Sequence, residues 1–244
     1  MKIRIASVLY NERDMLPFYL RHYASFADEI ILYDDNSDDG SATLAVCCPI
    51  VTLKPWPFPS GLDDNRMMDL WQVVMDQARK DGVDWVMMPD IDEILYSPRG
   101  LRQTCLDADA KGYQVITSEG WNMTGDGLPV DDGKSQITEL LQTGVRAPVY
   151  AKSIIVNPKA KVNWNRGRHA LENCNPRVSP APMVKLLHYR YLGYKYTKER
   201  NARNYHRVGA DKGCAWSNAP DYHGEHSPEW AEGAKKLALN AITA

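Results

Sequence analysis

Apolar runs of strand length alternate with helix-spaced apolar positions through the first half of the chain. The runs are rich in β-branched and aliphatic residues and end in turn-forming or acidic residues, a pattern typical of buried strands. They cover residues 3–9, 29–33, 50–53 and 85–88. Helical spacing indicates helices within residues 15–26 and 62–80, and Gly82 ends the second one. This alternation predicts an α/β fold with a Rossmann-like, mostly parallel central sheet flanked by helices.

The pattern changes after Gly112, where strands and helices no longer alternate regularly. The expected strands are residues 113–121 and 148–156, and the expected helices are residues 135–143, 196–208 and 227–241. The last helix has a start signal, because Ser227 precedes Pro228 at the first helical position. We therefore expect one domain over residues 1–244, with a mixed second half that begins at about residue 113.

Three polar clusters follow predicted strands of the first half. They are Tyr10-Asn11-Glu12, residues 34–41 ("DDNSDDGS") and residues 90–93 ("DIDE"). Each alone has an ordinary explanation as a helix cap, a turn or a solvated loop. In open α/β sheets, however, ligands bind outside the carboxyl ends of the strands, and all three clusters would share that edge. The shared edge favours a ligand site.

Asp90 and Asp92 are two positions apart, so at an extended strand end both would project to the same side while Ile91 turns inward. Two adjacent carboxylates favour a bound cation. Oxygen ligands suit Mg²⁺ or Mn²⁺, and Mg²⁺ is commonly held by one or two carboxylates together with substrate phosphates. The sequence thus predicts a divalent cation that a diphosphate would share.

The motifs "VLYNE", "ILYDDNSDDGS" and "WVMMPDIDEIL", in this order, resemble the nucleotide-sugar-binding half of GT-A fold glycosyltransferases, in the family 2-like group with a D-x-D-E motif. Further along, "SEGWNMTGDG" resembles the Trp-containing glycine loop of that group. "RGRHALE" and "LLHYRYLG" resemble its two downstream histidine segments, so the resemblance runs from about residue 8 to 193. It implies transfer of a sugar from a UDP- or GDP-sugar to a hydroxyl of a glycan or glycolipid, in surface glycan or polysaccharide synthesis.

The resemblance also implies roles for individual residues. The donor-binding residues would be Tyr10, Asn11, Glu12, Asp34, Asp35, Arg66 and Asp90. Asn65 and Arg66 stand in a different order from the family's donor contact. Asp90, Asp92 and His188 would bind Mn²⁺ or Mg²⁺, with Asp90 also touching ribose or sugar hydroxyls. For His188 and for His169, a packed histidine without a ligand is the alternative.

An inverting enzyme needs a base for the acceptor hydroxyl, and the candidates are Glu119, Asp126 and His169. Glu119 is the first choice because it lies at an expected strand end just before Trp121. No segment matches the family's base element cleanly, so inverting and retaining mechanisms both stay open. Trp121 is a candidate stacking surface for an acceptor sugar, with core packing as the alternative.

The composition bears on which partners the protein could bind. The formal net charge of -2 does not suggest binding to nucleic acid, because the chain has no overall positive charge. The expected helix over residues 196–208 is basic. It could cap a diphosphate or touch an anionic glycolipid or membrane surface, and such a charge run is also typical of a solvated face. No apolar run approaches the roughly 20 residues that cross a bilayer. The five cysteines lack paired spacing, so we expect reduced, mostly buried thiols in a cytoplasmic protein, with peripheral membrane contact as an option.

Two rival functions remain. "DIDEIL" also resembles the D-x-D-x-[TV]-L motif of haloacid-dehalogenase-type phosphatases, although Ile94 replaces Thr or Val and that motif normally lies on the first strand. The second rival is a GT-A scaffold that binds a sugar nucleotide without turnover. Capture of an aspartyl-phosphate would identify the phosphatase, and donor hydrolysis or transfer would separate an enzyme from the binding module.

Overall fold

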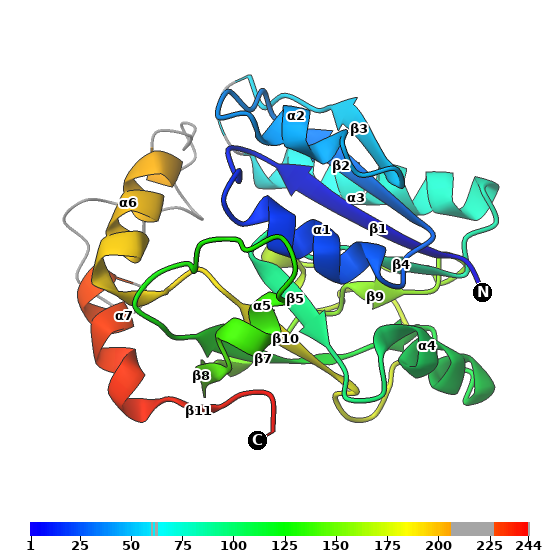
Figure 1. Ribbon diagram of the computed structural model, residues 1–244. Helices are drawn as coiled ribbons and strands as arrows, with labels where there is room; N and C mark the ends of the chain where they lie inside the picture. The colour runs from blue at the N-terminus through cyan, green and yellow to red at the C-terminus, as the bar shows by residue number, and fades with distance from the viewer. Residues whose placement is uncertain (60, 62, 206–226, 244) are drawn as a thin grey trace.

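The computed structural model describes residues 1–59, 61, 63–205 and 227–243, which form two β-sheets with helices around them (Figure 1). The first sheet has the order β3 (Val51–Pro55), β2 (Glu29–Asp34), β1 (Ile3–Leu9), β4 (Trp85–Met87), β9 (Ile155–Val156), β6 (Val115–Ile116). Its first four strands are parallel, and β9 pairs antiparallel with both β4 and β6. The predicted α/β fold with a mostly parallel sheet is confirmed.

Helices cover this sheet as the apolar spacing predicts. Figure 1 shows α1 (Leu16–Ala24) on one side of the sheet and α3 (Asp64–Lys80) on the other, with the short α2 (Ser41–Ala45) near β3. The stripe on α3 buries Leu70, Trp71, Val74 and Ala78. Asp63 caps the helix by accepting from the backbone N–H groups of Asn65 and Arg66. Gly82, at φ 66°, ends it as expected, and the expected start at Leu62 lies outside the described residues.

The second sheet is mixed. Its order is β11 (Leu239–Asn240), β8 (Thr143–Arg146), β7 (Ser118–Met123), β10 (Val184–His188), β5 (Glu93–Tyr96). Only β7 and β10 pair in parallel. The remaining helices are α4 (Leu101–Ala110), α5 (Ile137–Leu140), α6 (Gly193–Tyr205) and α7 (Pro228–Ala234), and the 3-10 turns are η1 (Pro148–Tyr150), η2 (Arg166–Arg168) and η5 (Lys235–Leu237). Figure 1 shows α6 and α7 together at one end of the molecule.

Several predicted elements of the second half are wrong in part. The expected strand 113–121 is two strands, β6 and β7, in different sheets. The break falls at Thr117, because its N–H donates to Ser179 Oγ instead of to a neighbouring strand. The expected strand 148–156 reduces to β9, since Pro148 cannot donate to a ladder and starts η1. The C-terminal helix stops at Ala234 rather than 241, and residues 206–208 of the basic helix lie outside the described residues.

The chain passes from the first sheet to the second within residues 88–92, directly after β4 and before β5. Helix α1 holds this crossing through two buried tyrosines. The hydroxyl of Tyr23 donates to the Glu93 carbonyl and accepts from the Leu95 N–H, each at 3.0 Å. Ser7 donates to the Pro89 carbonyl and also bonds the hydroxyl of Tyr19. The acidic motif therefore lies on a braced turn between two sheets.

The described cysteines, Cys47, Cys48, Cys105 and Cys174, are free thiols. The expectation that they are mostly buried is wrong, because only Cys105 is buried; Cys47 and Cys48 follow the short α2 at the surface. No helix within the described ranges is both long and apolar enough to cross a membrane.

His22 of α1 gives the fold a pH-dependent element. Its Nε2 lies 2.9 Å from the Leu95 carbonyl, and burial lowers the pKa of His22 to about 4. Below about pH 6.5, His22 therefore binds a proton in the unfolded chain but stays neutral in the folded chain. The stability that His22 contributes above pH 6.5 is lost as pH falls toward 4. We expect wild type to lose about 1 to 2 kcal/mol more than His22→Gln between pH 8 and pH 5, measured by urea unfolding. Parallel pH profiles of the two proteins would contradict this.

Candidate functional site

The carboxyl ends of β1 and β4 bring four acidic side chains together. Glu12 follows β1, and Asp90, Asp92 and Glu93 lie after β4, its parallel neighbour. Glu12, Asp92 and Glu93 are buried, whereas the side chain of Asp90 is 39% exposed. This acid group is the feature on which the candidate site is built.

Arg200 of α6 bridges the two strand ends. Its Nη1 and Nη2 donate to Glu12 Oε2 at 2.8 Å and Oε1 at 2.5 Å, and Nη2 also donates to Asp92 Oδ2 at 2.9 Å. The Arg200 side chain is 4% exposed. A planar guanidinium suits such a two-pronged pair with a carboxylate. A residue near the C-terminal end of the chain thus neutralises acids from the first sheet.

Lys152 bridges the other pair of acids from the segment before β9. Its Nζ donates to Asp90 Oδ2 at 2.8 Å and to Glu93 Oε1 at 2.5 Å. Glu93 Oε2 accepts from the Asp90 N–H at 3.0 Å, so Glu93 braces the turn that carries Asp90. The predicted extended strand end is wrong: the Glu93 N–H donates to the Asp90 carbonyl at 3.0 Å and closes a turn, so the two aspartates engage different cations.

Arg168 of η2 supplies the third cation. Its Nη2 donates to Asp90 Oδ1 at 2.7 Å and its Nη1 donates to the Met88 carbonyl. The guanidinium also lies over the Trp71 ring, 4.4 Å from its centroid. Arg168 has φ 64°, a conformation that L residues with a side chain rarely adopt. The strained backbone lets η2 insert a buried guanidinium against Asp90.

These contacts set the ionisation of the group. Burial alone would raise the pKa of Asp90, but the charges of Lys152 and Arg168 outweigh it and hold that pKa below its ordinary value. In the same way, the charge of Arg200 holds the pKa of Asp92 well below its ordinary value against the effect of burial. Burial would lower the pKa of Lys152, and the neighbouring Asp90 and Glu93 raise it instead. Both aspartates and the lysine are therefore charged at neutral pH.

His188 and Asp92 form the part of the site that suits a divalent cation. Asn122 Oδ1 lies 3.1 Å from His188 Nδ1, and an amide oxygen only accepts, so Nδ1 carries the proton. His188 Nε2 therefore presents a lone pair to Asp92 Oδ2 at 3.5 Å, an arrangement that favours a cation or a proton between them. Asp90 fits less well as a direct ligand, because Lys152 and Arg168 bond its two oxygens. Within the described ranges, no three acidic, histidine or cysteine side chains converge as a ready-made metal site.

An aromatic group borders His188. The Tyr150 ring centroid lies 4.7 Å from that of His188, and its hydroxyl is 2.9 Å from the hydroxyl of Tyr191, which in turn contacts Trp230 of α7. Tyr150 reaches this place because η1 packs directly on β7 at Gly120. A Cβ at Gly120 would lie 2.4 Å from the Ala147 carbonyl oxygen, so any side chain there would push η1 away.

The other expected donor-binding residues lie at the ends of β1 and β2 and, for Arg66, in the first turn of α3. Tyr10 is partly exposed, and Asn11, at φ 51°, exchanges two hydrogen bonds with Asp38 across the loop. The Asp35 carboxylate is buried and accepts from the Phe58 N–H at 2.6 Å, while Asp34 accepts from the Ser37 N–H. Arg66 donates to the Pro57 carbonyl at 2.9 Å and lies over the Trp56 ring.

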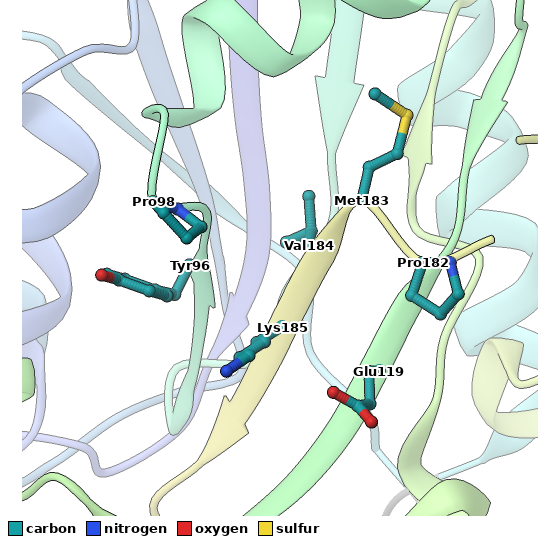
Figure 2. Close-up of a pocket in the computed structure, with 7 residues that line it drawn as sticks. All are labelled: Tyr96, Pro98, Glu119, Pro182, Met183, Val184 and Lys185. Atoms are coloured by element: carbon teal, nitrogen blue, oxygen red, sulfur yellow. The ribbon is translucent and has the colours of Figure 1, made fainter. Parts of the chain in front are cut away.

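Glu119 and Trp121 lie on the opposite face of the second sheet from the acid group. In the register of β7 against β10, Asn122 is opposite His188, whereas Glu119 is opposite Lys185 one face away. Figure 2 shows Glu119 and Lys185 on neighbouring strands at a cavity of about 190 Å³. Trp121 is fully buried and donates to Glu119 at 3.0 Å, so its ring offers no open face for a sugar.

The two remaining base candidates lie in different surroundings. Asp126 is 95% exposed and pairs with Lys235 at 2.6 Å, away from the acids. His169 adjoins Arg168, and its Nδ1 lies 3.2 Å from the Ala151 carbonyl, next to Lys152. Desolvation, followed by the charge of Lys152, lowers the pKa of His169. Of the three candidates, only His169 lies beside the acid group.

Sequence reasoning missed the contacts that Lys152, Arg168 and Asn122 make in the candidate site. Lys152 carries a usable signal, because it is a single charge within the apolar run "YAKSIIV". A charge inside a buried strand segment requires a partner of opposite charge. Nothing in the sequence marks Asn122 beyond its place after Trp121.

Comparison with protein-family models gave no match, and no curated protein matches the sequence. Solved structures that are similar to part of the chain include a cytidylyltransferase from Leptospira borgpetersenii (15% identity, 48% of this chain, 52% of that one, TM-score 0.30). Another, from Desulfovibrio desulfuricans, is assigned as a nucleotide-diphospho-sugar transferase (17%, 50% and 59%, TM-score 0.31). A third is a 4-diphosphocytidyl-2C-methyl-D-erythritol synthase (8%, 69% and 84%, TM-score 0.36). The chain spans about half the length of the first two, and at these scores none establishes a family or an activity for it.

The role of Lys152 can be tested by stability. We expect Lys152→Met to lower the free energy of unfolding by about 3 to 5 kcal/mol, because Glu93 is left buried without a cation. Adding Glu93→Gln should recover part of the loss, since it removes that charge. Exposed Lys198→Met is the control and should change stability by less than about 0.5 kcal/mol in urea unfolding. A loss below about 1 kcal/mol for Lys152→Met would contradict a buried ion-pair network.

Proposed function

We propose that this chain is a glycosyltransferase of GT-A architecture that moves a sugar from a nucleotide-diphosphate sugar to a hydroxyl acceptor. The observation that carries the proposal is the convergence of Glu12, Asp90 and Asp92 at the carboxyl ends of adjacent parallel strands. That edge is where open α/β sheets bind nucleotides. The order of motifs along the chain, which resembles the family 2-like glycosyltransferases, supports the same function.

In this proposal the donor lies along the ends of β1, β2 and β4. Asp35 and the loop tied down by Asn11 would hold the nucleoside, with Tyr10, Asp34 and Arg66 at its border. Asp90 would accept from a ribose or sugar hydroxyl, because it is the most exposed acid of the group and is kept ionised. Lys152 and Arg168 would orient the Asp90 carboxylate from behind, since they bond it from the buried side.

A divalent cation, Mn²⁺ or Mg²⁺, would be held by Asp92 and His188. Such an ion, when bound, stabilises negative charge on a leaving diphosphate. Asn122 fixes the tautomer of His188 so that Nε2 is available, as outer-shell partners of metal ligands commonly do. Asp90 would then serve the donor more than the metal.

His169 is the proposed base for the acceptor hydroxyl. Its lowered pKa keeps the imidazole neutral at pH 7, the form that accepts a proton. Glu119 would need a route through the second sheet to reach the donor. The acceptor would approach over Tyr150 and Trp230, which are partly exposed, rather than over the buried Trp121, because aromatic rings suit the apolar faces of sugars. Glycan or glycolipid acceptors and a place in surface glycan synthesis follow from the resemblance.

The outer face of α6 exposes Lys195 and Lys198. These charges would suit an anionic glycolipid headgroup or a peripheral contact with a membrane surface.

Donor binding can be tested without knowing the acceptor. We expect one UDP- or GDP-sugar to raise the unfolding temperature in the presence of Mn²⁺, because a ligand of the native state stabilises it by mass action, by about 2.7 kcal/mol at one hundred times Kd. Asp92→Asn should remove the metal-dependent part of the shift. A panel of UDP-, GDP-, CMP- and dTDP-sugars without any shift, with or without metal, would contradict the proposal. Binding without donor hydrolysis or transfer would indicate the non-catalytic scaffold instead.

The base assignment predicts a pH profile. We expect His169→Ala to lower kcat by about 10² to 10³ with little change in donor KM, because proton transfer and not binding is lost. The wild-type rate should fall only as pH drops below the ordinary histidine value of 6.5, since protonation of His169 removes the base. The variant should lack this acidic limb. Glu119→Gln is the matched comparison and should retain activity; the reverse result would refute the assignment.

A further inference from the structure

Arg200 bonds two acids of the site, Glu12 and Asp92, in different ways. Its Nη2 donates both to Glu12 Oε1 and to Asp92 Oδ2, whereas its Nη1 donates to Glu12 and not to Asp92. The guanidinium can therefore release Asp92 and still keep its two-pronged pair with Glu12. The bond to Asp92 is the separable part of the arrangement.

The oxygen that Arg200 bonds is also the one that a metal would use. Asp92 Oδ2 lies 2.9 Å from Arg200 Nη2 and 3.5 Å from His188 Nε2, the nitrogen whose lone pair is available. A guanidinium and a divalent cation at this one carboxylate oxygen repel each other, so each weakens the binding of the other. Binding of the ion would therefore favour a shift of Arg200 away from Asp92.

We propose that Arg200 is an internal counter-cation that competes with the divalent cation for Asp92, so that metal binding weakens one tie between α6 and the first sheet. The proposal deepens the proposed function and rests on it. Without metal, Arg200 keeps Asp92 and Glu12 compensated in a buried setting. With metal, Asp92 turns to the ion and Arg200 stays with Glu12.

Removing Arg200 gives this proposal a signature that a purely structural arginine would lack. Arg200→Met leaves Glu12 and Asp92 buried without their cation and must destabilise the fold. A divalent ion can replace the lost charge at Asp92 and meets no competitor there. The variant should therefore gain more stability from Mn²⁺ than wild type gains.

Arg4 is the matched control. It is also a buried arginine, 2% exposed, that bridges two acids, Glu29 and Asp81. Arg4 lies at the amino end of β1, Glu29 lies at the amino end of β2, and Asp81 follows α3. All three are at the opposite end of the first sheet from the site. Arg4→Met should destabilise the fold in a similar way, but its response to Mn²⁺ should equal that of wild type.

The experiment measures thermal unfolding of wild type, Arg200→Met and Arg4→Met with and without Mn²⁺, in the absence of nucleotide, together with a Mn²⁺ titration followed by electron paramagnetic resonance. We expect the Mn²⁺-induced rise in unfolding temperature to be at least twofold larger for Arg200→Met than for the other two, and Mn²⁺ to bind it about tenfold more tightly, a factor worth about 1.4 kcal/mol. Adding Asp92→Asn should abolish the gain. An equal response in all three proteins, or no response in any of them, would overturn the competition.

If Arg200→Met fails to fold, the double variant Glu12→Gln/Arg200→Met leaves Asp92 as the single uncompensated acid. Its Mn²⁺ affinity is then compared with that of Glu12→Gln, with the same tenfold gain expected and equality overturning the proposal. Failure here is distinguishable from failure of the proposed function. If a nucleotide-sugar still stabilises wild type while Arg200→Met and wild type bind Mn²⁺ equally, only the proposed competition is contradicted. If no nucleotide binds at all, the proposed glycosyltransferase function is contradicted.

Discussion

The fold around the site depends on the compensation of buried negative charge. Four carboxylates meet between the ends of β1, β4 and β5, and three basic side chains from later segments bond them. An ionised carboxylate buried alone is strongly unfavourable, so each acid requires its cation and each cation requires its acid. Lys152, Arg168 and Arg200 therefore fix three downstream segments against the first sheet.

This compensation explains why the acidic motif lies where the chain changes sheets. A turn at residues 90–93 would expose its backbone and strain the crossing, but Glu93 accepts from the Asp90 N–H while Tyr23 bonds the backbone on both sides of Ile94. The same turn carries Asp90 outward to partial exposure and Asp92 inward to His188. One local conformation thus separates two neighbouring aspartates into an exposed acid that can meet a ligand and a buried acid that can meet a cation.

The sequence predicted β1 to β4, α1 and α3 of the first half, because these elements are decided locally, but not α2, β5 or α4. The stripe on α3 and the short apolar strands bury the residues that their spacing assigns. The second half depended on long-range events that no periodicity encodes: the N–H of Thr117 leaves its ladder for Ser179, and η2 bends through a left-handed Arg168. For the site, the acids were predictable from strand ends. Their partners were not, since Arg200 is 188 positions from Glu12 and only the tertiary fold brings them together.

The charge of the group also bears on the order in which ligands would bind. Four carboxylates outnumber the three basic side chains that bond them. A diphosphate adds more negative charge of the same sign, in a setting where three of the acids are buried and repulsion is poorly screened. A divalent ion, if Asp92 and His188 bind one as proposed, would offset this excess of acids. Under the proposed function, the cation would therefore bind before or together with the nucleotide, and the proposed competition makes Arg200 the side chain that it would displace.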